Sequence, residues 1–445
     1  MFPVDHVPGF GGIDRETWLQ RSANTLPAYG VIFALPLYLF SLIFLGRMTG
    51  FSYLPFVTAY LGALAAYFII LANLPQLSHR TLILLLLIGT GARFFLVFQK
   101  PLLSDDLYRC LWEGIVTLNG KNPYRLAPAA PELESLRPVW HHLINHAAYP
   151  AIYPPLTTLF NTMVAWIYPN PFFYKGCLSL ADLLLTLIIG LRLRFLHKPR
   201  RDLLLYFLHP LPILEISGNG HHEALVLLTA MTAFYFLDRR KLTAAAAWFA
   251  GAILSKYFFL VLISEFRNRR TPLIILLSSV LLFAPFLSAR GKLFFSLGAY
   301  LENWEFNASL YRLGTLLISD HQHLRLLLAL SYLIFWLHLN FKVKPTSSQR
   351  PVMLLTGLLL VSPTVHPWYG LWLLPFLVFY RYQAGLLFIS LLPLSYIVLE
   401  NFLATGLWRE NYWITALLYS PLLFANMQAT LTAFVRYAGQ KKSGP

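Results

Sequence analysis

Residues Phe51–Leu74 read FSYLPFVTAYLGALAAYFIILANL and contain no charged side chain. A run of this kind matches the about 20 apolar residues that a helix needs to cross the hydrocarbon core of a bilayer. Val31–Met48, Leu82–Phe98 and Leu324–Phe341 approach the same length. Of the 445 residues, 57% are hydrophobic and 12% are charged, against roughly 25% charged residues in soluble domains. The sequence therefore excludes a soluble core and predicts an all-α, polytopic membrane protein.

The formal net charge of +16 invites a nucleic-acid interpretation. The Lys and Arg residues, however, lie in short clusters between apolar runs, where such residues determine membrane topology. We therefore expect membrane lipids, and no nucleic acid, among the partners. The clusters expected in the cytoplasm are Lys198–Arg201, Arg239–Lys241, Arg267–Arg270, Lys342–Lys344 and Arg436–Lys442.

The chain reads as a single membrane domain over residues 1–445, without a repeat, a low-complexity tract or a soluble second domain. Residues 1–30 lack the pattern of a signal peptide and are expected to be cytoplasmic or interfacial. Within them, Ile13–Asn24 suits a short interfacial helix anchored by Trp18. Cys110 and Cys177 are too few for a disulfide framework or a thiolate zinc site, so we expect free thiols, with pairing across the outer face as the alternative.

Two apolar segments do not fit a simple count of spans. Pro155–Tyr168 is short for a crossing, and Leu242–Phe266 returns to the side that it left. Each suits a re-entrant or broken hairpin, which a membrane tolerates where protein or a water-filled cavity satisfies the exposed backbone. Without them, the pattern predicts about twelve spans with both termini inside.

The remaining connections are then expected on the outer face, which carries an unusual share of the polar residues. The longest, residues 99–154, follows the third span and has about 55 residues, whereas ordinary connections have only a few. Aromatic and proline-rich sequence argues against disorder in this loop, so we expect it to be functional. The others are Gly218–Glu223, a second loop at residues 288–323, Ser362–Tyr369 and Asn401–Tyr412.

Two adjacent carboxylates, Asp105 and Asp106, follow directly on the third span. Neighbouring side chains on a helix point about 100° apart, so one can face a cavity while a partner holds the other. This division suits a general base and its supporting residue. The alternative is a helix N-cap, with Ser104 and the two carboxylates preceding the helix that begins near Leu107.

The run SDDLYRCLWEGIVTLNGKNPYRLAP (Ser104–Pro128), followed by INHAAYPAIYPPLTTLF (Ile144–Phe160), resembles the GT-C superfamily of glycosyltransferases. In particular it is similar to bacterial multi-spanning mannosyltransferases that use polyprenyl-phosphate sugars. GNGHHEAL (Gly218–Leu225), SKYFFL (Ser255–Leu260) and SPTVHPWYGLWLLP (Ser362–Pro375) also resemble outer-face motifs of that family. The sequence departs from the family where it has Glu113 instead of Asp and Lys256-Tyr257 instead of Lys-Pro.

The resemblance implies a GT-C-like bundle in the plasma (inner) membrane with its active site on the outer, periplasmic face. It also implies an inverting transfer of a hexose, with mannose resting on the resemblance alone, from polyprenyl phosphate to a lipid or glycan acceptor. We expect Asp105 to be the general base and Asp106 its partner, although the two roles can be exchanged. No phosphate-cradling glycine motif for a soluble nucleotide-sugar donor stands out. No cofactor is expected.

Cationic groups matter for the leaving lipid phosphate, because that group departs as a phosphate monoester. Lys256 is the sharpest candidate, since Ala244–Phe259 carries no other charge and a lysine in an apolar segment is costly. The alternative is snorkelling of Lys256 to the headgroups. The further candidates for the donor phosphate are Arg109, Arg125, Arg290, Lys292 and Arg312.

Aromatic and polar residues of the outer connections are the candidates for binding the sugar or the acceptor. For His221, His222 and Glu223 the alternatives are a plain polar turn or a metal site, which needs three or four converging ligands. For His366, Trp368 and Tyr369 the alternative is an aromatic belt at the membrane interface. The full set also contains Trp112, Glu113, Asn122, Tyr124, His146, Tyr153 and Tyr257.

Two other functions compete with this interpretation. A secondary transporter or flippase places its charges at the membrane midplane in broken helices, whereas this chain gathers its polar groups at one face. A polymerase or ligase of lipid-linked glycans also acts at the outer face, and the residues alone do not separate it from a monosaccharide transferase. The sequence therefore favours a glycosyltransferase, with both alternatives left open.

Overall fold

The computed structural model describes residues 29–425, and within them it contains helices and no strand. The predicted interfacial helix at Ile13–Asn24 and the basic cluster Arg436–Lys442 lie outside the described residues. The chain divides into two compact units, which are considered separately. We name them the N-terminal unit, Gly30–Trp304, and the C-terminal unit, which begins at Glu305.

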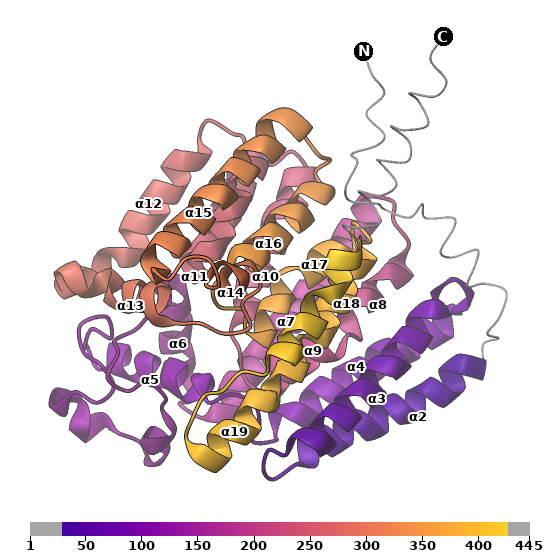
Figure 1. Ribbon diagram of the computed structural model, residues 1–445, viewed down its shortest axis with the longest axis horizontal. Coiled ribbons are helices and arrows are strands. Elements are labelled where there is room, and N and C mark those ends of the chain that lie inside the picture. The colour runs from indigo at the N-terminus through magenta and orange to yellow at the C-terminus, as the bar shows by residue number, and fades with distance from the viewer. Residues whose placement is uncertain (1–28, 426–445) are drawn as a thin grey trace. The chain divides into compact units, whose positions relative to one another are not determined.

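The N-terminal unit is built from apolar helices of very different lengths (Figure 1). Local signals fix their starts: Ser78 Oγ accepts a hydrogen bond from Thr81 N at 3.1 Å, and Asn170 Oδ1 accepts one from Phe172 N at 2.8 Å. The helices are α2 (Tyr29–Arg47), α3 (Tyr53–Ala72), α4 (His79–Val97), α5 (Asp106–Leu118), α6 (Pro155–Ile167), α7 (Pro171–Phe195), α8 (Leu204–Phe207), α9 (Pro210–Pro212), α10 (Glu223–Asp238), α11 (Leu242–Ser255), α12 (Thr271–Phe283) and α13 (Phe295–Asn303).

The C-terminal unit is also helical. A single parallel bridge between Phe306 and Thr364 joins two of its loops, with Phe306 N donating to Pro363 O at 3.0 Å. Its helices are α14 (Leu310–Gly314), α15 (His321–His338), α16 (Gln349–Val361), α17 (Leu374–Leu377), α18 (Gln383–Leu391), α19 (Ile397–Thr405) and a last apolar helix, Tyr412–Ala425.

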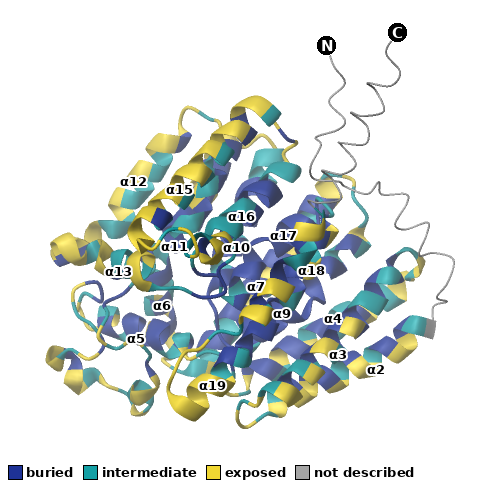
Figure 2. Ribbon diagram, in the orientation of Figure 1, coloured by how far each residue is buried: buried dark blue, intermediate teal, exposed yellow. Residues whose placement is uncertain are grey.

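Among residues 29–425, seven helical segments are long and apolar enough to cross a membrane, so the expectation of an all-α membrane protein holds. The predicted count of about twelve spans is not confirmed, because several apolar helices have only 10–17 residues. Figure 2 shows long exposed stretches on α12 and α15. Their large exposed apolar side chains are leucines, isoleucine and valine, as expected of helix faces in contact with lipid.

Of the two segments that did not fit the count, one forms a short regular helix and the other is broken. Pro155–Ile167 forms α6, whose 13 residues are short for a span. The α11 helix ends at Ser255, Lys256 takes an extended conformation (φ −156°, ψ 116°), and a 3₁₀ segment, Tyr257–Glu265, follows. The predicted interruption is therefore present at Lys256, while its depth in the membrane stays a prediction.

Two buried arginines of the N-terminal unit form ion pairs, as expected where water is excluded. Arg93 Nε donates to Asp182 Oδ2 at 2.6 Å, and Arg192 Nε donates to Asp238 Oδ2 at 2.6 Å. Tyr206 donates its hydroxyl to Asp182. These pairs join α7 to α4 and α10, and so they fix the scaffold from which the site is built.

The connection between α4 and α5 is held by two buried side chains. Lys175 Nζ donates to Leu96 O at 2.8 Å and to Gln99 O at 2.5 Å, which satisfies carbonyls at the C-terminal end of α4. Asn219 Oδ1 accepts from the backbone N–H groups of residues 102 and 103, at 3.2 and 3.0 Å. The start of α5, with its two carboxylates, therefore has a fixed position.

The packing of α5 on α6 requires a residue without a side chain at Gly114. A Cβ atom there would lie 2.2 Å from Asn161 O, which is far inside contact distance. A substitution at this position would thus push α6 away from α5, and with it the end of the loop that connects them. The close approach of the two helices makes this loop compact although it spans residues 119–154.

Candidate active site

The two carboxylates lie at the N-terminal end of α5, where the helix dipole favours negative charge. Asp105 occupies the N-cap position, but its side chain makes no capping hydrogen bond within the described structure. Instead, Ser104 Oγ accepts from Asp106 N at 3.3 Å. Asp105 thus occupies the N-cap position, but its carboxylate does not cap the helix and stays available for chemistry.

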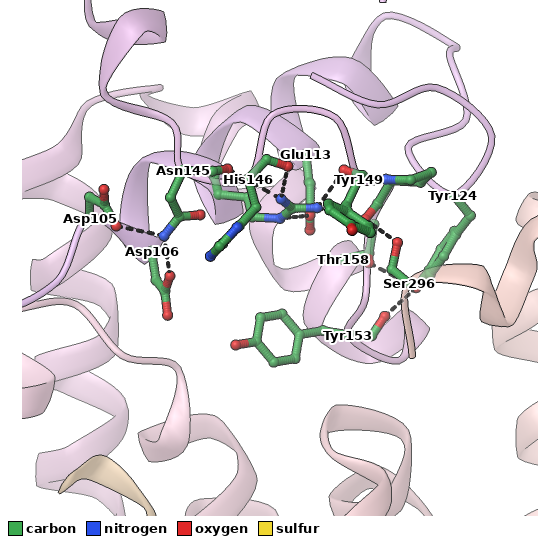
Figure 3. Close-up of polar contacts among 12 residues, drawn as sticks. Asp105, Asp106, Glu113, Tyr124, Asn145, His146, Tyr149, Tyr153, Thr158 and Ser296 are labelled. Carbon is green, nitrogen blue, oxygen red and sulfur yellow. Dashed lines mark hydrogen bonds and ion pairs between the residues drawn. The ribbon is translucent and has the colours of Figure 1, made fainter. Parts of the chain in front are cut away.

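One amide holds both carboxylates. Asn145 Nδ2 donates to Asp105 Oδ1 at 2.5 Å and to Asp106 Oδ1 at 2.6 Å, as the dashed lines in Figure 3 show. Asn145 comes from the far end of the loop, 40 residues along the chain from Asp105. Adjacent like charges repel each other, and a shared donor reduces that cost while it fixes both side chains.

The pKa of Asp105 lies above its usual range. The Asp105 side chain is exposed on one side. Burial of its other sides by the protein and the negative charge of Asp106 raise the pKa of Asp105 to about 6, although the hydrogen bond from Asn145 lowers it. Figure 3 shows the Asp106 carboxylate and the Tyr153 hydroxyl directed toward the same side, with Asp105 farther away. Asp106 is therefore the member of the pair that faces the other buried polar residues.

Arg109, a predicted ligand of the donor phosphate, is committed to the loop itself. Its Nε donates to Glu113 Oε1 at 3.2 Å. Its two terminal nitrogens donate to four backbone carbonyls, those of Asn145 (3.4 Å), His146 (3.0 Å), Tyr149 (2.7 Å) and Pro150 (2.6 Å). A guanidinium has five N–H donors, and Arg109 donates five hydrogen bonds within the N-terminal unit. Arg109 thus holds the segment that carries Asn145.

Glu113 lies one turn behind Arg109 on α5 and is buried. Burial raises the pKa of Glu113 to about 7, although Arg109 lowers it. Its second oxygen, Oε2, has no hydrogen-bond partner among the described residues. Glu113, which stands where the resemblance predicts Asp, therefore supports Arg109 from the next turn of α5.

Three other predicted binding residues build the loop. Trp112 is buried in a cluster with Val116, Leu133 and Ile144. Tyr124 donates its hydroxyl to Tyr153 O at 2.7 Å. The amide of Asn122 donates to Phe286 O at 2.9 Å and its oxygen accepts from Tyr124 N at 3.0 Å. Their positions give them a structural role, and their predicted contacts with sugar stay untested.

A second polar cluster comes from Tyr153, His222, Glu223 and Lys256. Lys256 is buried and donates to Glu223 Oε1, and its Nζ lies 5.6 Å from the centroid of the Tyr153 ring. The His222 ring lies edge-on to Tyr153 at 4.0 Å. Burial and the charge of Lys256 lower the pKa of His222 while Asp106 raises it, so His222 lies within electrostatic reach of both. The structure therefore brings these residues together on the side that Asp106 faces.

His221 connects this cluster to a deeper carboxylate. Its Nδ1 lies 4.0 Å from Asp106 Oδ2, and its Nε2 lies 3.4 Å from Glu215 Oε2. Burial lowers the pKa of His221 to about 3, so the ring is neutral at physiological pH and neither contact is an ion pair. Glu215 belongs to a π-helical segment, Ile213–Gly218, a type of irregularity that is frequent at functional sites.

The other predicted residues lie outside these two clusters. His146 is exposed, with its ring 5.1 Å from that of Trp304, and Arg125 is exposed on the loop. The Tyr257 hydroxyl is buried without a hydrogen-bond partner within residues 29–425. In the C-terminal unit, His366 stacks on Trp368 at 4.3 Å, Tyr369 stacks on Trp372 at 4.1 Å, and Arg312 lies 4.2 Å from the Tyr412 ring.

Sequence reasoning missed Asn145, Lys175, Asn219 and Glu215. Asn145 stands in the quoted run INHAAYP, but an amide carries no charge signal and its partners lie 39 and 40 residues away. Within the part of the chain that the structure describes, no three His, Cys, Asp or Glu side chains converge as a metal site requires.

Comparison with known proteins identifies a family. A family model described as "Alpha-(1->6)-mannopyranosyltransferase, N-terminal domain" matches residues 42–266, which contain both clusters of the N-terminal unit. No curated protein matches the chain. No solved structure matches it either.

The hydrogen bonds of Arg109 predict that this residue stabilises the loop. Arg109→Met should loosen residues 145–150, because it removes the donors to four backbone carbonyls. It also leaves Glu113 buried without its cation, which should lower the stability of the fold by about 3–5 kcal/mol. Arg109→Lys should give an intermediate effect, since an ammonium has three donors. Amide hydrogen exchange measured by mass spectrometry tests this, with exposed Arg125→Met as the matched control. Wild-type exchange rates in Arg109→Met would remove this role.

Proposed function

Because the chain belongs to the Alpha-(1->6)-mannopyranosyltransferase family, we propose that it transfers a mannosyl residue from polyprenyl phosphate to an acceptor hydroxyl at the outer face of the plasma membrane. The family match supports mannose as the sugar and, by its description, an α-(1→6) linkage. The apolar helices support a donor that resides in the bilayer. The positive clusters support the outer face, since the connection that carries Asp105 and Asp106 lies opposite to them in the predicted topology.

The proposed reaction is a single displacement. The acceptor oxygen attacks the anomeric carbon, the bond between that carbon and the phosphate oxygen breaks, and polyprenyl phosphate leaves as a monoester. The acceptor proton passes to a carboxylate of the Asp pair, and the configuration at the anomeric carbon inverts. The site thus needs a base near the acceptor and a cation near the leaving phosphate.

Asp106 suits the base best, with Asp105 as its partner. The carrying observation is the shared donor Asn145, which holds both carboxylates and leaves Asp106 turned toward Tyr153. The second carboxylate, Asp105, adds a negative charge beside the position where the acceptor proton arrives. The sequence favoured Asp105 as base with exchangeable roles, and the geometry supports the exchanged assignment.

Lys256 suits the phosphate best among the predicted cations. Arg109 already directs its donors to the loop, and Arg125 is exposed. Lys256 is buried beside Tyr153 and His222, on the side that Asp106 faces. Its ion pair with Glu223 stabilises the ammonium in a site where a lone charge would be costly. A donor phosphate would share this ammonium with Glu223.

Substitution of the two carboxylates tests the proposed base. Asp106→Asn should lower turnover about 10²- to 10⁴-fold with donor binding retained, because the amide keeps the shape but accepts no proton. Asp105→Asn should cost less. The wild-type rate should also fall as pH drops through about 6, where Asp105 takes up a proton and its charge is lost.

Asp105→Asn already lacks that charge, so its rate should show no inflection near pH 6. The readout is the pH profile of turnover with each purified variant. A large loss in Asp105→Asn combined with near-normal turnover in Asp106→Asn would restore the sequence-based assignment. Near-normal turnover in both variants would refute the base assignment altogether.

A double variant tests the phosphate contact without leaving a buried charge unpaired. Lys256→Met with Glu223→Gln removes both members of the ion pair. It should weaken donor binding by about 1.5–3 kcal/mol, the range for a hydrogen bond to a charged group, or about 10- to 150-fold. Exposed Lys121→Met is the control. Unchanged donor affinity in the double variant would show that Lys256 does not bind the phosphate.

A further inference from the structure

The C-terminal unit contains a cavity that the proposed reaction does not use. It has a volume of about 490 Å³ and lies at the end of α19 and the loop that follows it, a region that is largely exposed in Figure 2. Its lining includes Asn401, Arg409, Glu410, Asn411, Tyr412 and Trp413. In the predicted topology this connection, Asn401–Tyr412, faces outward.

Local signals give this segment a defined shape. The α19 helix ends at Gly406, whose positive φ of 70° suits glycine, and Thr405 Oγ1 accepts from Leu407 N at 3.2 Å. The next helix starts where Asn411 Oδ1 accepts from Trp413 N at 3.1 Å. The cavity thus lies between two capped helix ends.

Neighbouring residues of the same unit hold two of the lining side chains. Glu410 Oε2 accepts from Asn307 N at 2.7 Å. The Tyr412 hydroxyl accepts from Arg312, whose guanidinium carbon lies 4.2 Å from the centroid of the Tyr412 ring. The phenol and the carboxylate are therefore preorganised.

Other lining groups stay open to a ligand. Trp413 is 87% exposed, so the face of its indole ring is open to a ligand. The guanidinium of Arg409 makes no ion pair or hydrogen bond with the residues that the structure describes. Together they offer a flat apolar face next to hydrogen-bond donors.

The chemistry of the lining differs from that of an apolar cavity in the same chain. A second cavity of about 460 Å³, between α4 and α7, is lined mainly by phenylalanine and leucine, such as Phe94, Phe98, Phe173 and Leu180. In the 490 Å³ cavity each lining side chain instead carries an amide, hydroxyl, phenol, indole or charged group. A lipid tail suits the former, whereas a ligand with many hydroxyls suits the latter.

We propose that this cavity binds pyranose units of a neutral glycan acceptor, with a sugar ring stacked on Trp413. Arg409 and Glu410 contribute one positive and one negative charge, so the lining favours a neutral polyhydroxyl ligand over a phosphate. An indole face beside amide and guanidinium donors satisfies both the C–H face and the hydroxyls of a pyranose. The identification of the sugar as an α-(1→6)-linked mannoside rests on the proposed function.

Ligand-observed NMR tests the proposal without turnover. The purified full chain in lipid nanodiscs is titrated with α-(1→6)-linked mannotetraose, and binding is compared between wild type and variants. Trp413→Ala should weaken binding about 2- to 12-fold, the range for loss of one aromatic stacking contact. Arg409→Met, at an exposed position that should tolerate the change, gives a second reading, and it should weaken binding as well.

Trp166→Ala is the matched control, because Trp166 is also an exposed indole, at 72%, but does not line the cavity. Asp106→Asn, expected to be inactive, should bind like wild type, so that failure of catalysis and failure of this site are distinguishable. Unchanged binding in both Trp413→Ala and Arg409→Met would overturn the proposal. Equal weakening in Trp166→Ala would overturn it too, since the effect would then reflect exposed indoles at a membrane surface.

Discussion

Two carboxylates side by side at the start of α5 repel each other, and the site depends on the one amide that holds them. Asn145 binds both at 2.5 and 2.6 Å. Asn145 is held in turn, because Arg109 donates to the backbone carbonyls of Asn145 and His146 and to those of residues 149 and 150. The geometry of the Asp pair therefore originates in a buried guanidinium that touches neither of its carboxylates.

The cost of a charged or polar group without a partner also explains the many buried polar contacts in the rest of the N-terminal unit. In an apolar surrounding, each ionised group needs a partner, and each helix end needs its backbone groups satisfied. Lys175 satisfies carbonyls at the end of α4, and Asn219 accepts from the backbone that leads into α5. Lys256 and Glu223 satisfy each other at the break after α11. The functional side chains thus lie where the membrane scaffold is interrupted.

The sequence predicted the elements that follow from composition and local pattern. The apolar runs appear as long helices, and the Asp pair stands at a helix start. It could not predict the number of spans, because short helices such as α6 and α11 are as apolar as the long ones. Arg109 was predicted to bind the donor phosphate because its charge is visible in a sequence. The backbone carbonyls that accept its hydrogen bonds are not. Asn145 was missed for the same reason, since its role arises from a contact across 40 residues.

The central claim is that a mannosyl residue moves from polyprenyl phosphate, with inversion, to a hydroxyl at position 6 of a mannoside. The most direct measurement is NMR of the product formed when purified protein in vesicles receives polyprenyl-phosphate mannose and a soluble α-mannoside. The account predicts a new α-(1→6) linkage whose anomeric configuration is opposite to that of the donor, with none formed from nucleotide-activated mannose. Retention of the donor's configuration, or transfer from the nucleotide donor alone, would contradict it.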